Sequence, residues 1–141
     1  MISSITCGCA LPHGLDHEGK GLNVFKNPRL LLHIEGACLF VLTLWFYYTG
    51  NYRWWIFAVL FFTPDLAMLG YLKDVKLGTT CYNFTHTLSL PVALLLIGLM
   101  GVAPRGIPYA LIWLSHIEFD RMLGFGLKYA TGFKDTHFQR V

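Results

Sequence analysis

Residues 30–48 read LLLHIEGACLFVLTLWFYY, an apolar run in which His33 and Glu35 are the ionisable residues. A helix needs roughly 20 such residues to cross the hydrocarbon core of a bilayer. Because the breaks between successive apolar runs are short, consecutive helices should pack antiparallel. The sequence therefore predicts an all-α polytopic membrane protein, a four-transmembrane-helix up-down bundle. Its spans are expected at about residues 30–48, 54–71, 81–100 and 107–125.

The composition of the whole chain agrees with a lipid environment. Of its 141 residues, 55% are hydrophobic and 13% are charged, about half the charged fraction of an average soluble domain. The mean hydropathy is +0.50, so there is too little polar surface to coat a water-soluble body. A net charge of +3, without a helix-turn-helix or zinc-finger spacing, argues against nucleic acid as a partner. Membrane lipid is the expected partner.

Basic residues are distributed unevenly over the two sides of this bundle. Nine of the 11 Lys and Arg fall before the first span, in the second loop and from Arg121 to the end of the chain, against two, Arg53 and Arg105, on the opposite side. The positive-inside rule then places both termini in the cytoplasm or the mitochondrial matrix. The predicted organisation is a non-membrane N-terminal extension (1–29), a transmembrane domain (30–125) and a polar tail (126–141). A bacterial inner membrane and a mitochondrial inner membrane both stay open.

Each predicted span carries polar residues that are costly in lipid. An ionisable side chain near the bilayer centre costs at least about 2.5–3.5 kcal/mol, so it usually faces the bundle interior or lines a functional pathway. Four of these residues, one in each span, lie five or six residues from the inner boundary: Glu35, Asp65, His86 and Asp120. At 1.5 Å per residue they share a layer roughly 8–9 Å deep. The sequence therefore predicts one polar layer built by all four helices.

Helical phase decides which of these side chains can converge. His116 and Asp120 are four residues apart and share a face, as do Tyr82 and His86. Glu35 and Asp120 are expected to point inward. His33 and Glu118 then point elsewhere, and we expect them to pair between helices or to contact a neighbouring subunit.

Three interpretations of the layer compete. The first is structural, because polar side chains hold helices together in lipid. The second is a metal-assisted or acid–base site, for which the mixed nitrogen and oxygen ligands suit zinc or iron. The third is axial ligation of haem or chlorophyll by a histidine. In the second, His86, His116 and Asp120 bind the metal, Glu35 or Asp65 acts as general base, and Arg121 pairs with a substrate head group or with Asp120.

Transport is a further class of function for a polar layer in a membrane. Four spans are few for alternating access, and the sequence predicts no pair of broken helices of the kind that marks a transport site. A transporter is therefore not the expected function.

Several strings carry a resemblance to one family. They are LHIEG (32–36), PDLAMLGY (64–71), YNFTHT (82–87), WLSHIEFDR (113–121), GFGLKY (124–129) and GFKDTH (132–137). Over about residues 30–140 the chain resembles the small bacterial integral-membrane family called domain of unknown function 4260. The family has no established activity. Its pattern maps onto Glu35, Asp65, His86, His116, Asp120 and Arg121, and its tail implies that Lys128, Asp135 and His137 fold back over the inner mouth or form a solvated end.

Two functions follow from the residues and the resemblance together. One is a metal-dependent or acid–base enzyme that acts on a lipid-soluble substrate. The other uses the departures from the family, the N-terminal extension and Glu118, as extra surface for partners. In that alternative the chain is an accessory structural subunit of a large respiratory, ATP synthase or photosynthetic complex, with the ancestral site idle.

Overall fold

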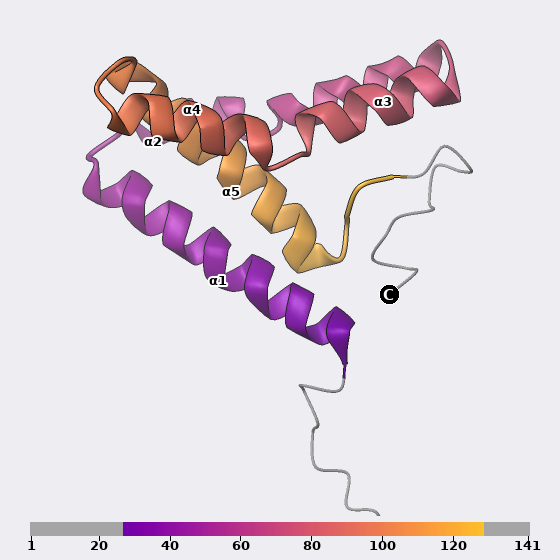
Figure 1. Ribbon diagram of the computed structural model, residues 1–141, viewed down its shortest axis with the longest axis horizontal. Coiled ribbons are helices and arrows are strands. Elements are labelled where there is room, and N and C mark those ends of the chain that lie inside the picture. The colour runs from indigo at the N-terminus through magenta and orange to yellow at the C-terminus, as the bar shows by residue number, and fades with distance from the viewer. Residues whose placement is uncertain (1–26, 129–141) are drawn as a thin grey trace, which may run out of the picture.

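The computed structural model describes residues 27–128, and all regular structure in this range is helical (Figure 1). The prediction of an all-α protein is confirmed. Residues 1–26 of the extension and residues 129–141 of the tail lie outside the described residues. The elements in chain order are α1 (Pro28–Thr49), α2 (Trp54–Leu60), the 3-10 helix η2 (Thr63–Leu72), α3 (Val75–Thr85), α4 (Ser89–Leu99), the 3-10 helix η3 (Pro104–Gly106) and α5 (Ile107–Leu123).

Three segments are long and apolar enough to cross a membrane: Pro28–Thr49, Trp54–Leu72 and Val75–Leu99. The fourth predicted span corresponds to α5, whose 17 residues stand at the lower end of the roughly 17–25 residues used by spanning helices. This helix has eight buried residues, more than any other helix in the described range. Its polar side chains are therefore sheltered by the surrounding helices.

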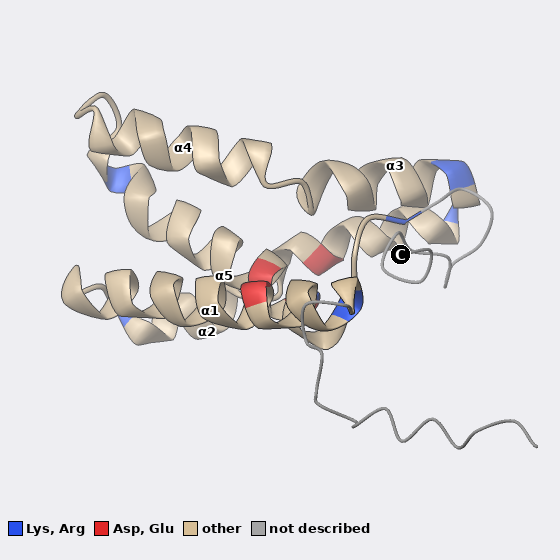
Figure 2. Ribbon diagram, turned by 60° about the horizontal axis from the view of Figure 1, so that its bottom comes forward, with Lys and Arg blue, Asp and Glu red and all other residues tan. Residues whose placement is uncertain are grey.

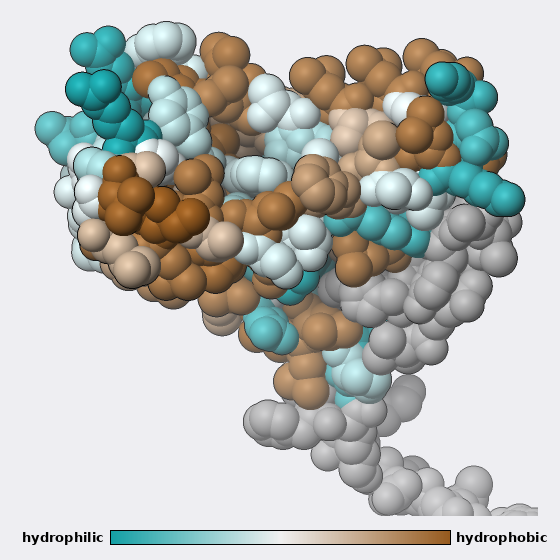
Figure 3. All heavy atoms as spheres, turned by 45° about the horizontal axis from the view of Figure 1, so that its top comes forward, coloured by the Kyte–Doolittle hydropathy of each residue, from teal (hydrophilic) through white to brown (hydrophobic). Residues whose placement is uncertain are grey.

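The outer surface fits a lipid environment. Large apolar side chains such as Trp45, Phe62 and Leu99 are more than half exposed. Figure 3 shows hydrophobic residues over much of one face and hydrophilic residues gathered toward its edges. Lys and Arg lie at the two ends of the bundle, with acidic segments between them (Figure 2). Cations at the ends and exposed apolar side chains between them are the distribution expected when the middle of the molecule contacts acyl chains.

Helices α1 and α5 lie side by side, and the packing is close because of small residues at their interface. A Cβ atom at Gly36 would lie 2.8 Å from the backbone nitrogen of Met122, so only glycine permits this approach. His33 Nδ1 donates to the Met122 carbonyl at 2.7 Å. Ser115 Oγ donates to Thr43 Oγ1 at 3.0 Å. The predicted interhelical pairing of His33 is thus confirmed.

The second and third spans are both interrupted, and here the prediction of unbroken helices is wrong. In the second span α2 ends at Leu60, and Pro64, which lacks a backbone N–H, stands at the start of η2. η2 continues for ten residues as a 3-10 helix, far beyond the usual run of about 3–4. In the third span the break separates Thr85 from Ser89. The ring of Pro91 opposes a continuous helix there, because it clashes with the carbonyl four residues earlier.

The hairpin of η2 and α3 corrects the predicted start of the third span. Helix α3 begins at Val75, six residues before the expected Cys81. Gly78 falls in the predicted break between the second and third spans, but it lies inside α3 against the Tyr71 ring, where a Cβ atom would have no room. His86 therefore lies 11 residues after the start of this span, or roughly 16 Å at 1.5 Å per residue. The prediction that His86 lies five residues after the start of its span is therefore wrong, and His86 stands near the middle of the candidate span Val75–Leu99.

Candidate metal centre

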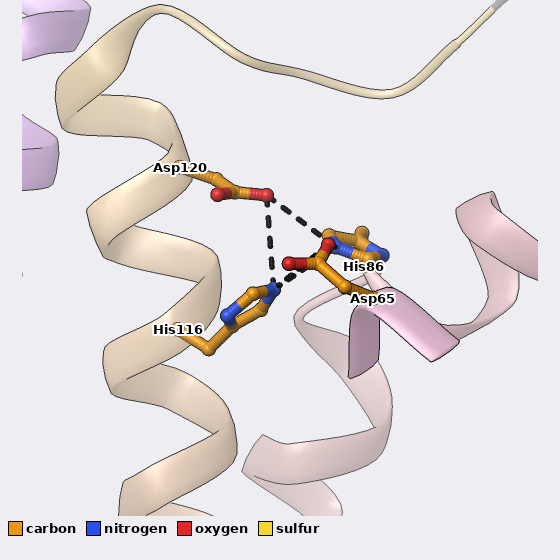
Figure 4. A group of neighbouring side chains, drawn as sticks. All are labelled: Asp65, His86, His116 and Asp120. Atoms are coloured by element: carbon orange, nitrogen blue, oxygen red, sulfur yellow. Dashed lines mark hydrogen bonds and ion pairs between the residues drawn. The ribbon is translucent and has the colours of Figure 1, made fainter. Parts of the chain in front are cut away.

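Four ionisable side chains meet where the two interrupted spans face α5 (Figure 4). Asp65 stands in the first turn of η2, and His86 is the residue that follows α3. His116 and Asp120 lie one turn apart on α5. The four side chains point toward one another, so the predicted convergence of these residues is confirmed. We call them the His/Asp cluster.

The distances within the His/Asp cluster are those of a ligand shell. His86 Nε2 lies 3.2 Å from His116 Nε2, 3.5 Å from Asp65 Oδ1 and 3.4 Å from Asp120 Oδ2. His116 Nε2 lies 3.5 Å from the same Asp65 oxygen and 3.8 Å from the same Asp120 oxygen. Bonds of about 2.0–2.2 Å to a tetrahedral metal separate the ligand atoms by roughly 3.3–3.6 Å. The five separations that include a histidine nitrogen, 3.2–3.8 Å, bracket this value, and all four ligand atoms lie within 4.8 Å of one another.

The hydrogen bonds of His86 turn the correct nitrogen toward the centre of the cluster. His86 Nδ1 is 2.9 Å from the Tyr82 carbonyl, which can only accept a hydrogen bond. In the neutral imidazole a proton on Nδ1 satisfies this carbonyl and leaves Nε2 with a lone pair that faces the cluster. Such a carbonyl partner is common behind histidines that bind metals. The buried Nδ1 of His116 has no hydrogen-bond partner within residues 27–128.

Burial makes the cluster costly without a cation. His86 is 4% exposed and His116 is 1% exposed, while the side chains of Asp65 and Asp120 are 40% and 17% exposed. The two imidazole nitrogens at 3.2 Å need a proton or a cation between them, because two facing lone pairs would repel each other. Two carboxylates beside them add negative charge in apolar surroundings, which needs compensation. A divalent cation would satisfy both requirements.

The helix breaks at the cluster are stabilised by side chains of the neighbouring elements. Trp113 Nε1 of α5 donates to the Thr85 carbonyl at 2.6 Å. Thr85 Oγ1 lies 3.3 Å from the Pro64 carbonyl, which joins the two interrupted spans. Irregular backbone at membrane depth is tolerated where protein groups satisfy its polar atoms. These contacts hold Asp65 and His86 in place.

Tyr82 is a part of the site that the sequence reasoning did not select. Its ring stacks on the His86 ring at a centroid distance of 3.8 Å. Its hydroxyl donates to Asp120 Oδ2 at 3.5 Å. The Tyr82 side chain therefore contacts and positions two of the four cluster residues, His86 and Asp120. The signal in the sequence was its i,i+4 spacing from His86.

The first residues of the tail return to the site, as the fold-back prediction expects of Lys128. Asn83 exchanges two hydrogen bonds of 2.8 Å with the backbone of Lys128. The Lys128 ammonium lies 4.1 Å from the centre of the Tyr82 ring. Burial lowers the pKa of Lys128, and the negative charges of Asp65 and Asp120 oppose this shift. Asp135 and His137 lie outside the described residues.

The other predicted site residues are not brought into the cluster. Glu35 is exposed on α1, so the prediction that it points inward is wrong. An α-helix turns by about 100° per residue, and the turn that directs Gly36 to α5 leaves Glu35 outside. Arg121 lies 4.0 Å from Glu118, which is 2% exposed. Arg121 also borders a cavity beside the cluster.

The fold and the cluster define a class: a helical membrane protein with a candidate metal centre inside its apolar region. The sequence matches the family model described as domain of unknown function DUF4260 over residues 29–141, so the chain belongs to this family and the predicted resemblance is confirmed. All four cluster residues fall within the match. The searches of curated proteins and of solved structures found no match.

Proposed function

We propose that the protein is a membrane-embedded metalloenzyme whose Asp65, His86, His116 and Asp120 bind one divalent zinc or iron ion. The observation that carries the proposal is the convergence of two imidazole nitrogens and two carboxylate oxygens at separations near those of a metal shell. Two nitrogen and two oxygen ligands suit zinc and iron. Calcium and magnesium prefer oxygen ligands alone.

Access to the cluster favours catalysis over a purely structural metal. Structural zinc sites are closed, whereas catalytic sites keep a position for water or substrate. A cavity of about 430 Å³ reaches His86 and Asp120, and Asp65 is the most exposed of the four side chains. A divalent metal held here supplies Lewis acidity and an activated water. Asp65 can act as the general base that the sequence suggested only when His86, His116 and Asp120 hold the metal and the fourth position is left to water.

A lipid-soluble substrate is supported by a second, apolar pocket beside the helix breaks. This pocket has a volume of about 270 Å³ and is lined by residues of α2, η2, α3 and α5, including Leu60, Pro64, Thr85 and Trp113. Two of its lining residues, Pro64 and Thr85, directly precede Asp65 and His86 in the chain. An apolar chain bound there would therefore lie beside the two interrupted spans that carry these cluster residues. Pockets between helices are common sites for small molecules.

Metal analysis of purified protein in detergent tests the proposal. We expect about one zinc or iron ion per chain in the unaltered protein, as a four-ligand site requires. His86→Ala, His116→Ala, Asp65→Asn and Asp120→Asn should lose most of it. His33→Ala and Asp74→Asn are matched controls, because His33 bonds to Met122 and Asp74 is exposed before α3. These controls should keep the metal.

The alternative of an accessory subunit with an idle site makes the opposite prediction. In that case the unaltered protein contains no metal above the level of the His116→Ala variant, and partner chains copurify at fixed stoichiometry. Direct pairs among His86, Asp65 and Asp120 would then serve only to hold the helices together. The same purified sample therefore separates the two functions.

A further inference from the structure

One face of helix α5 lines two cavities, with the His/Asp cluster between them. The residues of α5 that line the apolar pocket of about 270 Å³ are Tyr109, Ile112 and Trp113. Those that line the cavity of about 430 Å³ are Ile117, Asp120 and Arg121. Residues three or four apart share a helix face, and this spacing joins Trp113, His116 and Asp120 (Figure 4). The apolar pocket, the cluster and the larger cavity therefore follow one another along α5.

The apolar pocket ends close to the cluster on each element that carries a ligand. Trp113 precedes His116 by three residues, or about 4.5 Å along the helix axis at 1.5 Å per residue. In the two interrupted spans, Pro64 and Thr85 each line the pocket and directly precede a cluster residue. Three segments of the chain thus lead from the pocket wall to a proposed metal ligand within three residues.

The hydrogen-bond donors of the pocket wall are already engaged with backbone carbonyls. Trp113 Nε1 donates to the Thr85 carbonyl at 2.6 Å, and Thr63 Oγ1 donates to the Leu60 carbonyl at 2.6 Å. Thr85 Oγ1 lies 3.0–3.3 Å from three backbone carbonyls, which accept its single proton. The remaining polar side chain is that of Tyr109, which is 49% exposed. Inside this rim the pocket suits hydrocarbon, because a polar group placed there would lack a partner.

The larger cavity on the other side of the cluster has a different character. Polar side chains form part of its wall, among them Asn83, His86 and Asp120. It can therefore admit water, whereas the apolar pocket excludes polar groups. A molecule with an alkyl chain in the apolar pocket would meet the cluster at its polar end, where water reaches the same site.

We infer that the apolar pocket holds the alkyl chain of a single-chain fatty acyl compound whose carbonyl group lies at the His/Asp cluster. This inference rests on the proposed function, since it names the substrate class of the same site. A carbonyl is a group that a Lewis-acidic divalent metal polarises. One chain fits better than two, because a volume of about 270 Å³ lies below the roughly 300–1,000 Å³ of pockets that take drug-sized molecules.

Calorimetric titration of the full, metal-containing chain in digitonin tests the inference. Digitonin presents a steroid body, so the detergent supplies no alkyl chain that competes for the pocket. Dodecanohydroxamic acid carries a metal-binding head on an alkyl chain, and acetohydroxamic acid carries the same head without the chain. We expect the long probe to bind about tenfold more tightly or better, because each buried methylene group favours binding.

Two variants narrow the pocket without changing a proposed ligand. Leu60→Trp and Thr63→Phe each place an aromatic ring at a lining position. They should remove most of the preference for the long probe, while the metal content and the binding of acetohydroxamic acid stay as in the unaltered protein. Phe62→Trp is the matched control, because Phe62 is 63% exposed and does not line the pocket. His116→Ala should weaken the binding of both probes.

Metal analysis of the same samples distinguishes this inference from the proposed function. With full metal, equal affinity for the two probes, or an unchanged preference in Leu60→Trp and Thr63→Phe, would overturn this inference alone. Chain-dependent binding that is unchanged in His116→Ala would assign the pocket to the chain of a bilayer lipid, which also overturns it. Binding of the long probe by metal-free protein, weakened in both pocket variants and in His116→Ala, would overturn the proposed function alone.

Discussion

The His/Asp cluster has two halves that are built in different ways. His116 and Asp120 lie on α5, a continuous helix enclosed by its neighbours. Asp65 and His86 stand at interruptions in two other spans. The first pair is placed by helical geometry alone, because residues four apart share a face. The second pair depends on contacts with other elements, so the interrupted half should be the more easily disturbed.

The largest effect should come from removing a single histidine ligand, whichever half of the cluster it belongs to. His116→Ala and His86→Ala each delete a nitrogen from a shell with two. We expect metal affinity to fall by more than the roughly 10–100-fold that follows loss of a supporting residue. Metal titration of the purified variants, with circular dichroism to verify helix content, measures this. A variant that keeps normal affinity would remove its histidine from the proposed ligand set.

Trp113→Phe should disturb the interrupted half without removing a ligand. The indole N–H donates to the Thr85 carbonyl at the break in the third span, and phenylalanine leaves that carbonyl without this donor. The free energy of unfolding should drop by about 1–3 kcal/mol, the cost of an unsatisfied buried group. Denaturant titration in detergent measures the drop. Trp55→Phe is the matched control, since Trp55 is 62% exposed, and an equal drop in both variants would contradict the assigned role of Trp113.

Tyr82→Phe should act on metal binding more than on stability. The variant keeps the ring that stacks on His86 and loses the hydroxyl that donates to Asp120. Because this hydrogen bond is long, at 3.5 Å, we expect metal affinity to fall by about tenfold, the lower end of the effect of supporting residues. Tyr48→Phe, at an exposed position, is the control. Unchanged affinity in Tyr82→Phe would assign Tyr82 to packing alone.

The same division explains what the sequence could predict. The apolar runs predicted the helical class. The i,i+4 spacing predicted that His116 and Asp120 lie on one face of a helix and can both reach the site. The interruption at His86 could not be predicted, because Pro91 is tolerated in the first turn of a helix and only the path of the chain shows where that helix starts. The start of the third span at Val75 could not be predicted, because the packing of Gly78 against Tyr71 is a contact between elements. The prediction that Glu35 points inward was wrong, because a polar residue in a span does not reveal which face of its helix meets the bundle.

A change on the continuous side, away from the cluster, should give the smallest effect and sharpen the comparison. Ser115 is fully buried next to His116, but its hydroxyl faces α1, where it donates to Thr43. In Ser115→Ala the hydroxyl loses this contact and its 2.8 Å contact to the Leu111 carbonyl, which share one hydrogen, while Thr43 keeps its own hydrogen bond to the Phe40 carbonyl. We expect the free energy of unfolding to fall by about 0.5–1.5 kcal/mol, the net value of one hydrogen bond. Metal affinity should not change, because α5 itself places His116 and Asp120. A loss of metal in Ser115→Ala would mean that the α1 interface also positions the site, and the division into a continuous and an interrupted half would then be wrong.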